Sequence, residues 1–144
     1  MSFRKLTERV SASPQIGPGD VAQAAREGFG LIINNRPEGE SDDQVAGEHI
    51  AAAADAAGLG YVAIPVTHAG FSEWQVKAMA EALASTDKPV LAYCRSGTRS
   101  TLLWALAEAS QGTSPHSLAA SAAQAGYDLT PIRAMLDMLA TRGG

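Results

Sequence analysis

The sequence predicts an α/β protein with a central, mainly parallel sheet flanked by helices. Short apolar segments alternate with helical segments along the chain, and two of the apolar segments are almost continuously hydrophobic. Strands that alternate with helices form parallel sheets, and strands without polar positions are covered on both faces. At 144 residues, the chain has the length of one domain, which we expect to span residues 1–144.

Four strands are expected from runs of β-branched, aromatic and other apolar residues. They are Arg9–Ser13, Leu31–Asn34, Tyr61–Val66 and Pro89–Tyr93. The second and fourth are the nearly continuous apolar runs, so they belong in the middle of the sheet. The predicted order is strand and helix in alternation up to the fourth strand, followed by a loop and three helices.

Local chemistry marks where the helices begin and end. Two capping boxes and two N-cap residues before a proline predict four helix starts. They are Ser41–Gln44, Ser72–Gln75, Ser114–Pro115 and Thr130–Pro131. Glycine commonly ends a helix in a left-handed conformation, and four glycines occupy such places: Gly28, Gly58, Gly112 and Gly126.

Composition excludes several classes of partner. Hydrophobic residues make up 46% of the chain, the net charge is −4 and the pI is about 5.3, so no basic field attracts nucleic acid or anionic lipid. The apolar stretch 51–66 is interrupted by Asp55 and two glycines, and residues 1–5 contain no apolar signal region. We expect a cytoplasmic protein that contacts neither nucleic acid nor membrane, and no feature sets its oligomeric state.

A loop with the only cysteine of the chain follows the fourth predicted strand. Its sequence is Cys94-Arg95-Ser96-Gly97-Thr98-Arg99-Ser100, and a helix with an apolar face follows. Ligands of open α/β sheets bind at the carboxyl ends of strands. A short turn that leads into a helix N-terminus gathers backbone N–H groups and partial positive charge. The loop is therefore predicted to bind an anion.

The side chains of this loop suit nucleophilic chemistry. We expect Arg99 to offer a bidentate fork to an oxyanion and Arg95 to add a second positive charge. Ser100 can hydrogen-bond the sulfur of Cys94. The positive surroundings should favour the thiolate, which is the nucleophilic form of cysteine.

The remaining loop residues are predicted to bind the substrate through the backbone. Gly97 allows the chain to curl through torsions that other residues resist, and Ser96 and Thr98 flank it.

The alternative for Cys94 is a small buried core residue, but strand, glycine, arginine and helix all fall in the order that the anion loop needs. The three histidines lack ligand spacing, so we expect no metal and no other cofactor.

The loop resembles the active loops of two families. One comprises the cysteine-dependent phosphatases of the protein tyrosine and dual-specificity class, with Cys, five residues, Arg and then Ser or Thr. The other comprises the rhodanese sulfurtransferases, whose loops are often one residue shorter. Four residues separate Cys94 from Arg99, as in rhodaneses, whereas Ser100 is phosphatase-like.

The first 110 residues resemble a small bacterial phosphatase-like domain found beside, or fused to, beta-lactamase-like hydrolases. The resembling segments are Lys5–Thr7, Val10–Ser11, Asn34–Glu40, Tyr61–Val66 and Ala92–Ser100. The resemblance implies a fold of the phosphotyrosine protein phosphatase type. It leaves the reaction open.

Departures from the phosphatase pattern concern the proton transfers. Tyr93 stands where these enzymes usually have His, and the usual Asp general acid has no match in residues 67–73. His68 is the best substitute, because imidazole titrates near neutrality; a solvated loop histidine is the alternative. Arg36 follows the second predicted strand and is either a second anion contact or part of a polar strand end.

Three functions remain open from the sequence. A phosphatase would use Cys94 to attack phosphorus, with Arg99 and the loop N–H groups on the oxygens. A sulfurtransferase would carry sulfane sulfur on Cys94 as a persulfide, which suits the loop length. A non-catalytic module would use the loop only to bind an anion. The corresponding partner is a phosphorylated or sulfane-sulfur compound, either a small molecule or a protein.

Overall fold

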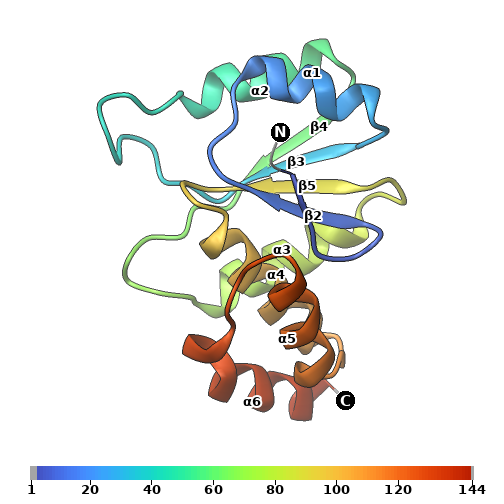
Figure 1. The fold of residues 1–144 in the computed structure, drawn as a ribbon. Helices are drawn as coiled ribbons and strands as arrows, with labels where there is room; N and C mark the ends of the chain where they lie inside the picture. The colour runs from blue at the N-terminus through green and yellow to red at the C-terminus, as the bar shows by residue number, and fades with distance from the viewer. Residues whose placement is uncertain (1–2, 144) are drawn as a thin grey trace.

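A five-stranded sheet forms the centre of the computed structural model, which describes residues 3–143 (Figure 1). The strands are β1 (Arg4–Lys5), β2 (Val10–Ser13), β3 (Leu31–Asn34), β4 (Gly60–Ala63) and β5 (Val90–Tyr93). Their order across the sheet is β1-β2-β5-β3-β4, and only β1 is antiparallel to its neighbour. The predicted parallel sheet is confirmed, and β1 was missed because two residues carry no periodic signal.

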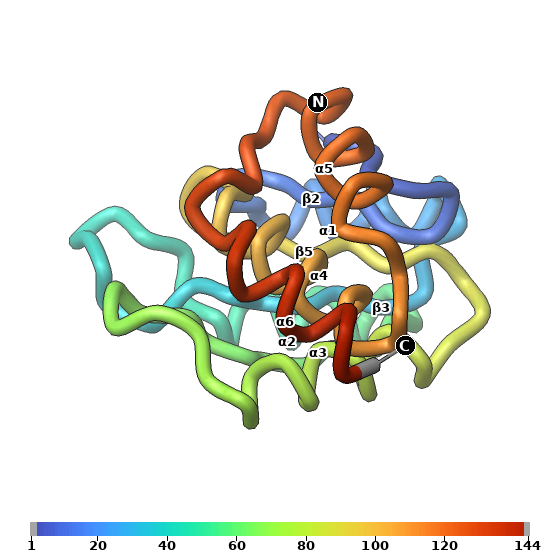
Figure 2. The backbone as a smooth tube through the Cα atoms, turned by 90° about the horizontal axis from the view of Figure 1, so that it is seen from below, coloured from blue at the N-terminus to red at the C-terminus, as the bar shows by residue number. Residues whose placement is uncertain are grey.

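Helices cover both faces of the sheet. They are α1 (Pro18–Arg26), α2 (Gly47–Ala56), α3 (Glu73–Ala84), α4 (Thr98–Ser110), α5 (Pro115–Gln124) and α6 (Arg133–Gly143), with a short 3-10 helix, η1 (Thr130–Ile132), before α6. Helices α1 and α2 lie on one face, and α3 to α6 lie on the other (Figure 1). Viewed from that second face, α5 and α6 lie over α4 (Figure 2).

The two central strands are apolar because each of their faces meets a different core. Ile32 and Leu91 pack with α1 and α2, whereas Ile33 and Ala92 pack with the helices of the other face. Every residue of β2, β3 and β5 is buried. Helix α4 is itself buried on nearly all sides, as its fully inaccessible Trp104 shows. Among the residues described, no helix is long and apolar enough to cross a membrane.

Two of the four predicted helix starts are found where the sequence placed them. Helix α3 begins after Ser72, whose N–H donates to Oε1 of Gln75 at 2.7 Å as a capping box requires. Helix α5 begins at Pro115 with Ser114 as its N-cap. The predicted helix ends are also confirmed, since all four glycines have a positive φ: Gly28, Gly58, Gly112 and Gly126.

The other two predicted starts are wrong. Helix α2 begins at Gly47, because Gln44 bonds the N–H of Glu40 instead of closing a capping box with Ser41. The carboxylate of Glu38 then accepts the Gly47 N–H at 2.9 Å. Thr130 begins the 3-10 turn η1, and α6 follows three residues later. In both places, other nearby side chains engage the expected cap residue: Ser41 bonds Arg36 and Asp43, and Thr130 bonds Asp128.

Candidate active site

The Cys94 loop lies at the carboxyl edge of the sheet, where the loops after β3, β4 and β5 meet (Figure 1). Cys94 directly follows β5, and its N–H donates to the carbonyl of Ser13 at the end of β2 at 3.3 Å. On the other side, the N–H of Asn35 donates to the carbonyl of Tyr93 at 2.8 Å. Hydrogen bonds to both neighbouring strands therefore fix the point at which the chain leaves the sheet at Cys94.

The loop turns sharply from β5 into α4. Gly97 adopts a φ of 92°, a left-handed conformation that favours glycine. Its N–H donates to Sγ of Cys94 at 3.1 Å, and the sulfur-bearing residue is completely buried. Helix α4 begins at the next residue, so its free N–H groups and the positive end of its dipole lie at the loop.

Three of the predicted substrate-binding residues have side chains on the outer side of the loop. Arg95, Ser96 and Thr98 are exposed, and the hydroxyl of Ser96 donates to that of Thr98 at 3.1 Å. The carbonyl of Arg95 accepts the N–H of Gln15 at 3.2 Å, which ties the loop to the segment after β2. The backbone of these residues, and not their side chains, lies at the site. Their role in substrate binding stays a prediction.

Arg99 forms a bidentate ion pair with Glu40. Its Nη1 lies 2.7 Å from Oε2 and its Nη2 lies 2.8 Å from Oε1. Nη1 also donates to the carbonyl of Val66 at 2.8 Å, so the pair joins the loops after β3, β4 and β5. The hydrogen bonds to Glu40 raise the pKa of Arg99, and the nearby Cys94 adds to this effect although burial opposes it.

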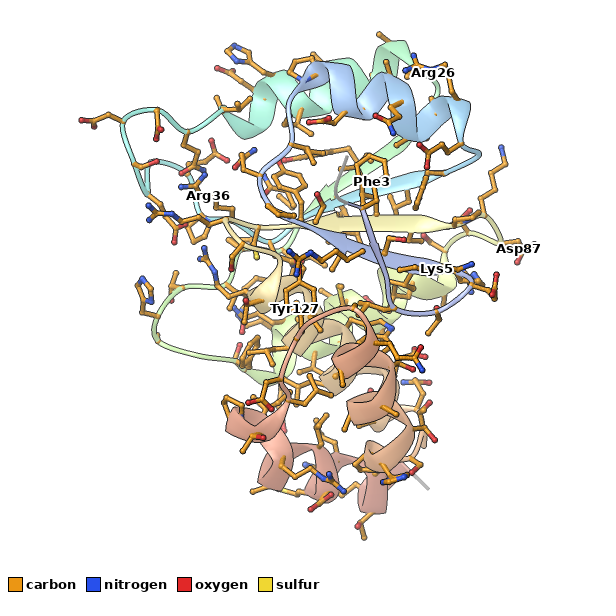
Figure 3. All side chains as sticks on the ribbon, in the orientation of Figure 1. Phe3, Lys5, Arg26, Arg36, Asp87 and Tyr127 are labelled. Atoms are coloured by element: carbon orange, nitrogen blue, oxygen red, sulfur yellow. The ribbon has the colours of Figure 1, made fainter. Side chains whose placement is uncertain are left out.

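Arg36, which lies in the loop after β3 (Figure 3), bonds the same carboxylate. Its side chain is 5% exposed, and its Nε donates to Oε1 of Glu40 at 3.0 Å. Its two other nitrogens donate to Gln15 at 2.9 Å and to Ser41 at 3.1 Å. The guanidinium predicted to contact substrate is thus engaged in holding Glu40, and a direct anion contact by Arg36 stays a prediction.

The two arginines set the charge of Glu40. The hydrogen bond from Arg99 lowers the pKa of Glu40 most, and Arg36 adds to it, while burial acts in the opposite direction. The result is a pKa of about 2 instead of 4.5. Glu40 is therefore a carboxylate at neutral pH and occupies the same fork of Arg99 that an oxyanion would use.

Ser100 has a different partner from the one expected. Its hydroxyl donates to Oδ1 of Asn35 at 2.8 Å instead of to the sulfur of Cys94. The amide of Asn35 donates in turn to the carbonyl of Ile64 at 2.9 Å. Both side chains are completely buried, so Ser100 ties the start of α4 to the ends of β3 and β4. The hydrogen bond from Ser100 to the sulfur is not formed in this structure, and a catalytic role of Ser100 stays a prediction.

His68 and Tyr93 differ in their relation to the site. His68 is exposed on the loop after β4, two residues beyond the carbonyl that contacts Arg99. Its role as general acid stays a prediction. Tyr93 packs into the core on the side of α1 and α2, and burial raises the pKa of its hydroxyl. It therefore does not replace the histidine that phosphatases have there.

Together, the parallel sheet, the buried cysteine after β5 and the arginine in the first turn of α4 define the architecture of a cysteine phosphatase. Residues 2–111 match the family described as "Beta-lactamase hydrolase-like protein, phosphatase-like domain". The chain belongs to this family, as the resemblance implied.

Individual relatives agree with this assignment. A beta-lactamase hydrolase-like protein of Xylella fastidiosa is 38% identical over 112 residues, which cover 78% of this chain but only 26% of the relative. A crystal structure from Neisseria meningitidis, assigned as a phosphatase, is 34% identical with a TM-score of 0.84, covering 96% of this chain and 99% of that one. TpbA of P. aeruginosa, solved with phosphotyrosine, shares the fold at 15% identity and a TM-score of 0.67, covering 99% and 90%.

Several residues of the site could not be identified from sequence patterns. Glu40 and Asn35 follow β3, which ends at the edge of the sheet where the site lies, but no sequence pattern indicates their contacts with Arg99 and Ser100. Gln15 follows β2 at the same edge, a position that could have indicated it. Tyr127 contacts the loop from a distant segment, and no motif marks it.

Replacing Glu40 with Gln is expected to destabilise the fold in a pH-dependent way. Because the native pKa of Glu40 is lowered from 4.5 to about 2, its ionisation stabilises the folded chain fully above pH 4.5, and this is lost as the pH falls towards 2. We expect E40Q to lower the free energy of unfolding by about 3 kcal/mol at neutral pH. Urea denaturation at several pH values measures this difference.

The matched control is Glu8→Gln, which removes the exposed ion pair with Lys5. Exposed pairs contribute little, so E8Q should unfold like the wild type. An E40Q effect that is the same at pH 3 and pH 7, or no larger than that of E8Q, contradicts this account of Glu40.

Proposed function

We propose that this protein is a cysteine-dependent phosphatase that hydrolyses phosphate monoesters through a phosphocysteine intermediate on Cys94. The observation that carries this proposal is the position of the sulfur at the N-terminus of α4, with the Gly97 N–H directed at it and Arg99 beside it. N–H donors and positive charge stabilise a negatively charged sulfur and the oxygens of a transferred phosphoryl group. Family membership supports the same chemistry.

The reaction has two displacement steps. The thiolate of Cys94 attacks phosphorus, an S–P bond forms, and the P–O bond to the alcohol breaks as the leaving oxygen takes a proton. Water then attacks phosphorus, the S–P bond breaks, and inorganic phosphate leaves with the thiolate restored. The loop N–H groups and Arg99 bind the phosphoryl oxygens in both steps.

Substrate binding requires an exchange of partners at Arg99. Glu40 occupies both terminal nitrogens of the guanidinium, so an incoming phosphate must take over this fork. Arg36 retains Glu40 through its Nε after the exchange. The carboxylate therefore keeps a positive neighbour when it releases Arg99, which limits the cost of the exchange.

The substrate class that we propose is an aryl phosphate such as a phosphotyrosine side chain, on a protein or a small molecule. The support is the fold shared with TpbA, whose structure contains phosphotyrosine. A phenol is also a good leaving group, which suits a site where the loop 64–72 carries no Asp or Glu.

A sulfurtransferase is the second candidate function. The specific observation is that only four residues separate Cys94 from Arg99, which makes the loop shorter than that of the protein tyrosine phosphatases. Transfer of sulfane sulfur also requires no carboxylic acid to protonate the leaving group. In that reaction, the Cys94 thiolate would attack the outer sulfur of thiosulfate, whose S–S bond breaks to release sulfite, and a persulfide forms. Cyanide would then remove the outer sulfur as thiocyanate and restore the thiolate.

Parallel assays of the wild type and Cys94→Ser separate the candidates. On p-nitrophenyl phosphate, we expect the wild type to release phosphate and C94S to lose activity by at least roughly a thousandfold, because the hydroxyl is a much weaker nucleophile. With thiosulfate and cyanide, no thiocyanate should form. Thiocyanate formation without phosphate release would reverse the assignment, and silence in both assays would leave an anion-binding module.

We also propose that His68 protonates the leaving group, because the loop that carries it is anchored to Arg99 through Val66. His68→Gln should lower kcat for phenyl phosphate by about a hundredfold. For p-nitrophenyl phosphate the loss should be small, since p-nitrophenolate leaves without a proton. His116→Gln, at the exposed start of α5, is the matched control. Equal losses on both substrates, or none on either, argue against His68.

A further inference from the structure

Tyr127 reaches the Cys94 loop from the C-terminal part of the chain. It lies between α5 and η1, and its side chain is directed towards the sheet (Figure 3). Its hydroxyl donates to the carbonyl of Ser96 at 3.1 Å. This segment lies outside residues 2–111, where the family match is found.

The contact acts on the peptide group that carries the N–H directed at the sulfur. The carbonyl of Ser96 and the N–H of Gly97 belong to one planar trans peptide, so they point in opposite directions. Tyr127 holds the carbonyl on one side, and the N–H meets Sγ of Cys94 at 3.1 Å on the other. A rotation of this peptide would break both hydrogen bonds together.

Gly97 makes room for the tyrosine as well as for the turn. A Cβ at this position would lie 2.0 Å from the Tyr127 hydroxyl and 2.9 Å from its ring. The hydroxyl therefore occupies the space that any side chain at position 97 would fill. Tyr127 and Gly97 are therefore sterically complementary.

Local structure fixes Tyr127 in this place. Gly126 follows the C-cap of α5 with a φ of 91°, and the N–H of Tyr127 bonds back to the carbonyl of Ala122 at 2.9 Å. The guanidinium of Arg4 lies 5.1 Å above the ring. Burial raises the pKa of Tyr127, which outweighs the effect of Arg4 and keeps the hydroxyl a proton donor at neutral pH.

We propose that Tyr127 is a positioning residue of the active loop: by holding the Ser96 carbonyl, it sets the peptide plane that presents the Gly97 N–H to the nucleophile. The segment between α5 and α6 thereby supports the active loop without touching the reacting atoms. The orientation of the peptide is independent of the reaction. Its effect on turnover rests on the proposed phosphatase function.

The first test is amide hydrogen exchange of the ligand-free full chain, measured by mass spectrometry. Tyr127→Phe removes only the hydroxyl, and we expect the peptide that covers residues 94–100 to exchange about fivefold faster, as the loss of one hydrogen bond predicts. Peptides from α3 should exchange as in the wild type. Ser110→Ala, which loses a hydroxyl-to-carbonyl hydrogen bond at the far end of α4, should leave the loop unchanged.

Rescue separates a hydrogen bond from packing. Incorporation of 4-aminophenylalanine at position 127 restores a donor on the ring and should restore the slow exchange of the loop. Unchanged exchange in Y127F overturns the proposal, as does faster exchange that is spread equally over α3. Failure of the amino analogue to restore protection overturns it too.

Turnover distinguishes this proposal from the proposed function. If the wild type hydrolyses p-nitrophenyl phosphate, Y127F should lower kcat about fivefold and kcat/KM by less, because the Gly97 N–H stabilises the negative charge that returns to the sulfur when the S–P bond of the intermediate breaks. An unchanged kcat overturns the catalytic role. If the wild type hydrolyses no phosphate ester, the phosphatase function fails, and the exchange experiment still decides the role of Tyr127.

Discussion

The ion pair between Arg99 and Glu40 is the interaction on which the rest of the site depends. It joins the first turn of α4 to the loop after β3, and through the Val66 carbonyl to the loop after β4. The buried side chain of Arg36 bonds the same carboxylate of Glu40. One carboxylate between two guanidinium groups keeps these loops together while no anion is bound, and it presents to Arg99 the same pair of oxygens that a phosphate would present.

The backbone of the Cys94 loop is held by contacts from three separate parts of the chain. The end of β2 bonds the N–H of Cys94, the end of β3 bonds the carbonyl that precedes it, and Tyr127 holds the peptide between Ser96 and Gly97. Such a loop is organised before any ligand arrives, so binding costs little conformational entropy there. The side chain of Ser100 serves the same purpose by joining α4 to Asn35.

Most of the fold and part of the site could be predicted from the sequence, because they depend on residues that are close together along the chain. The strand Leu31–Asn34, the capping box at Ser72 and the turn at Gly97 depend on neighbours along the chain, and the structure contains all three. The capping box expected at Ser41 failed because Arg36 and Glu40 use that segment for an ion-pair network. The partners of Ser100 and Ser96 lie 65 and 31 residues away, and no local pattern records such contacts.

Identifying a covalent intermediate on Cys94 tests the proposed phosphatase mechanism directly. The wild type would be mixed with p-nitrophenyl phosphate, quenched rapidly, and digested for mass spectrometry of the peptide that contains Cys94. The proposed mechanism predicts a mass increase of one phosphoryl group on this cysteine, absent from C94S. A hydrolysing enzyme whose Cys94 is never phosphorylated, or a cysteine that gains only a sulfur atom after incubation with thiosulfate, would contradict it.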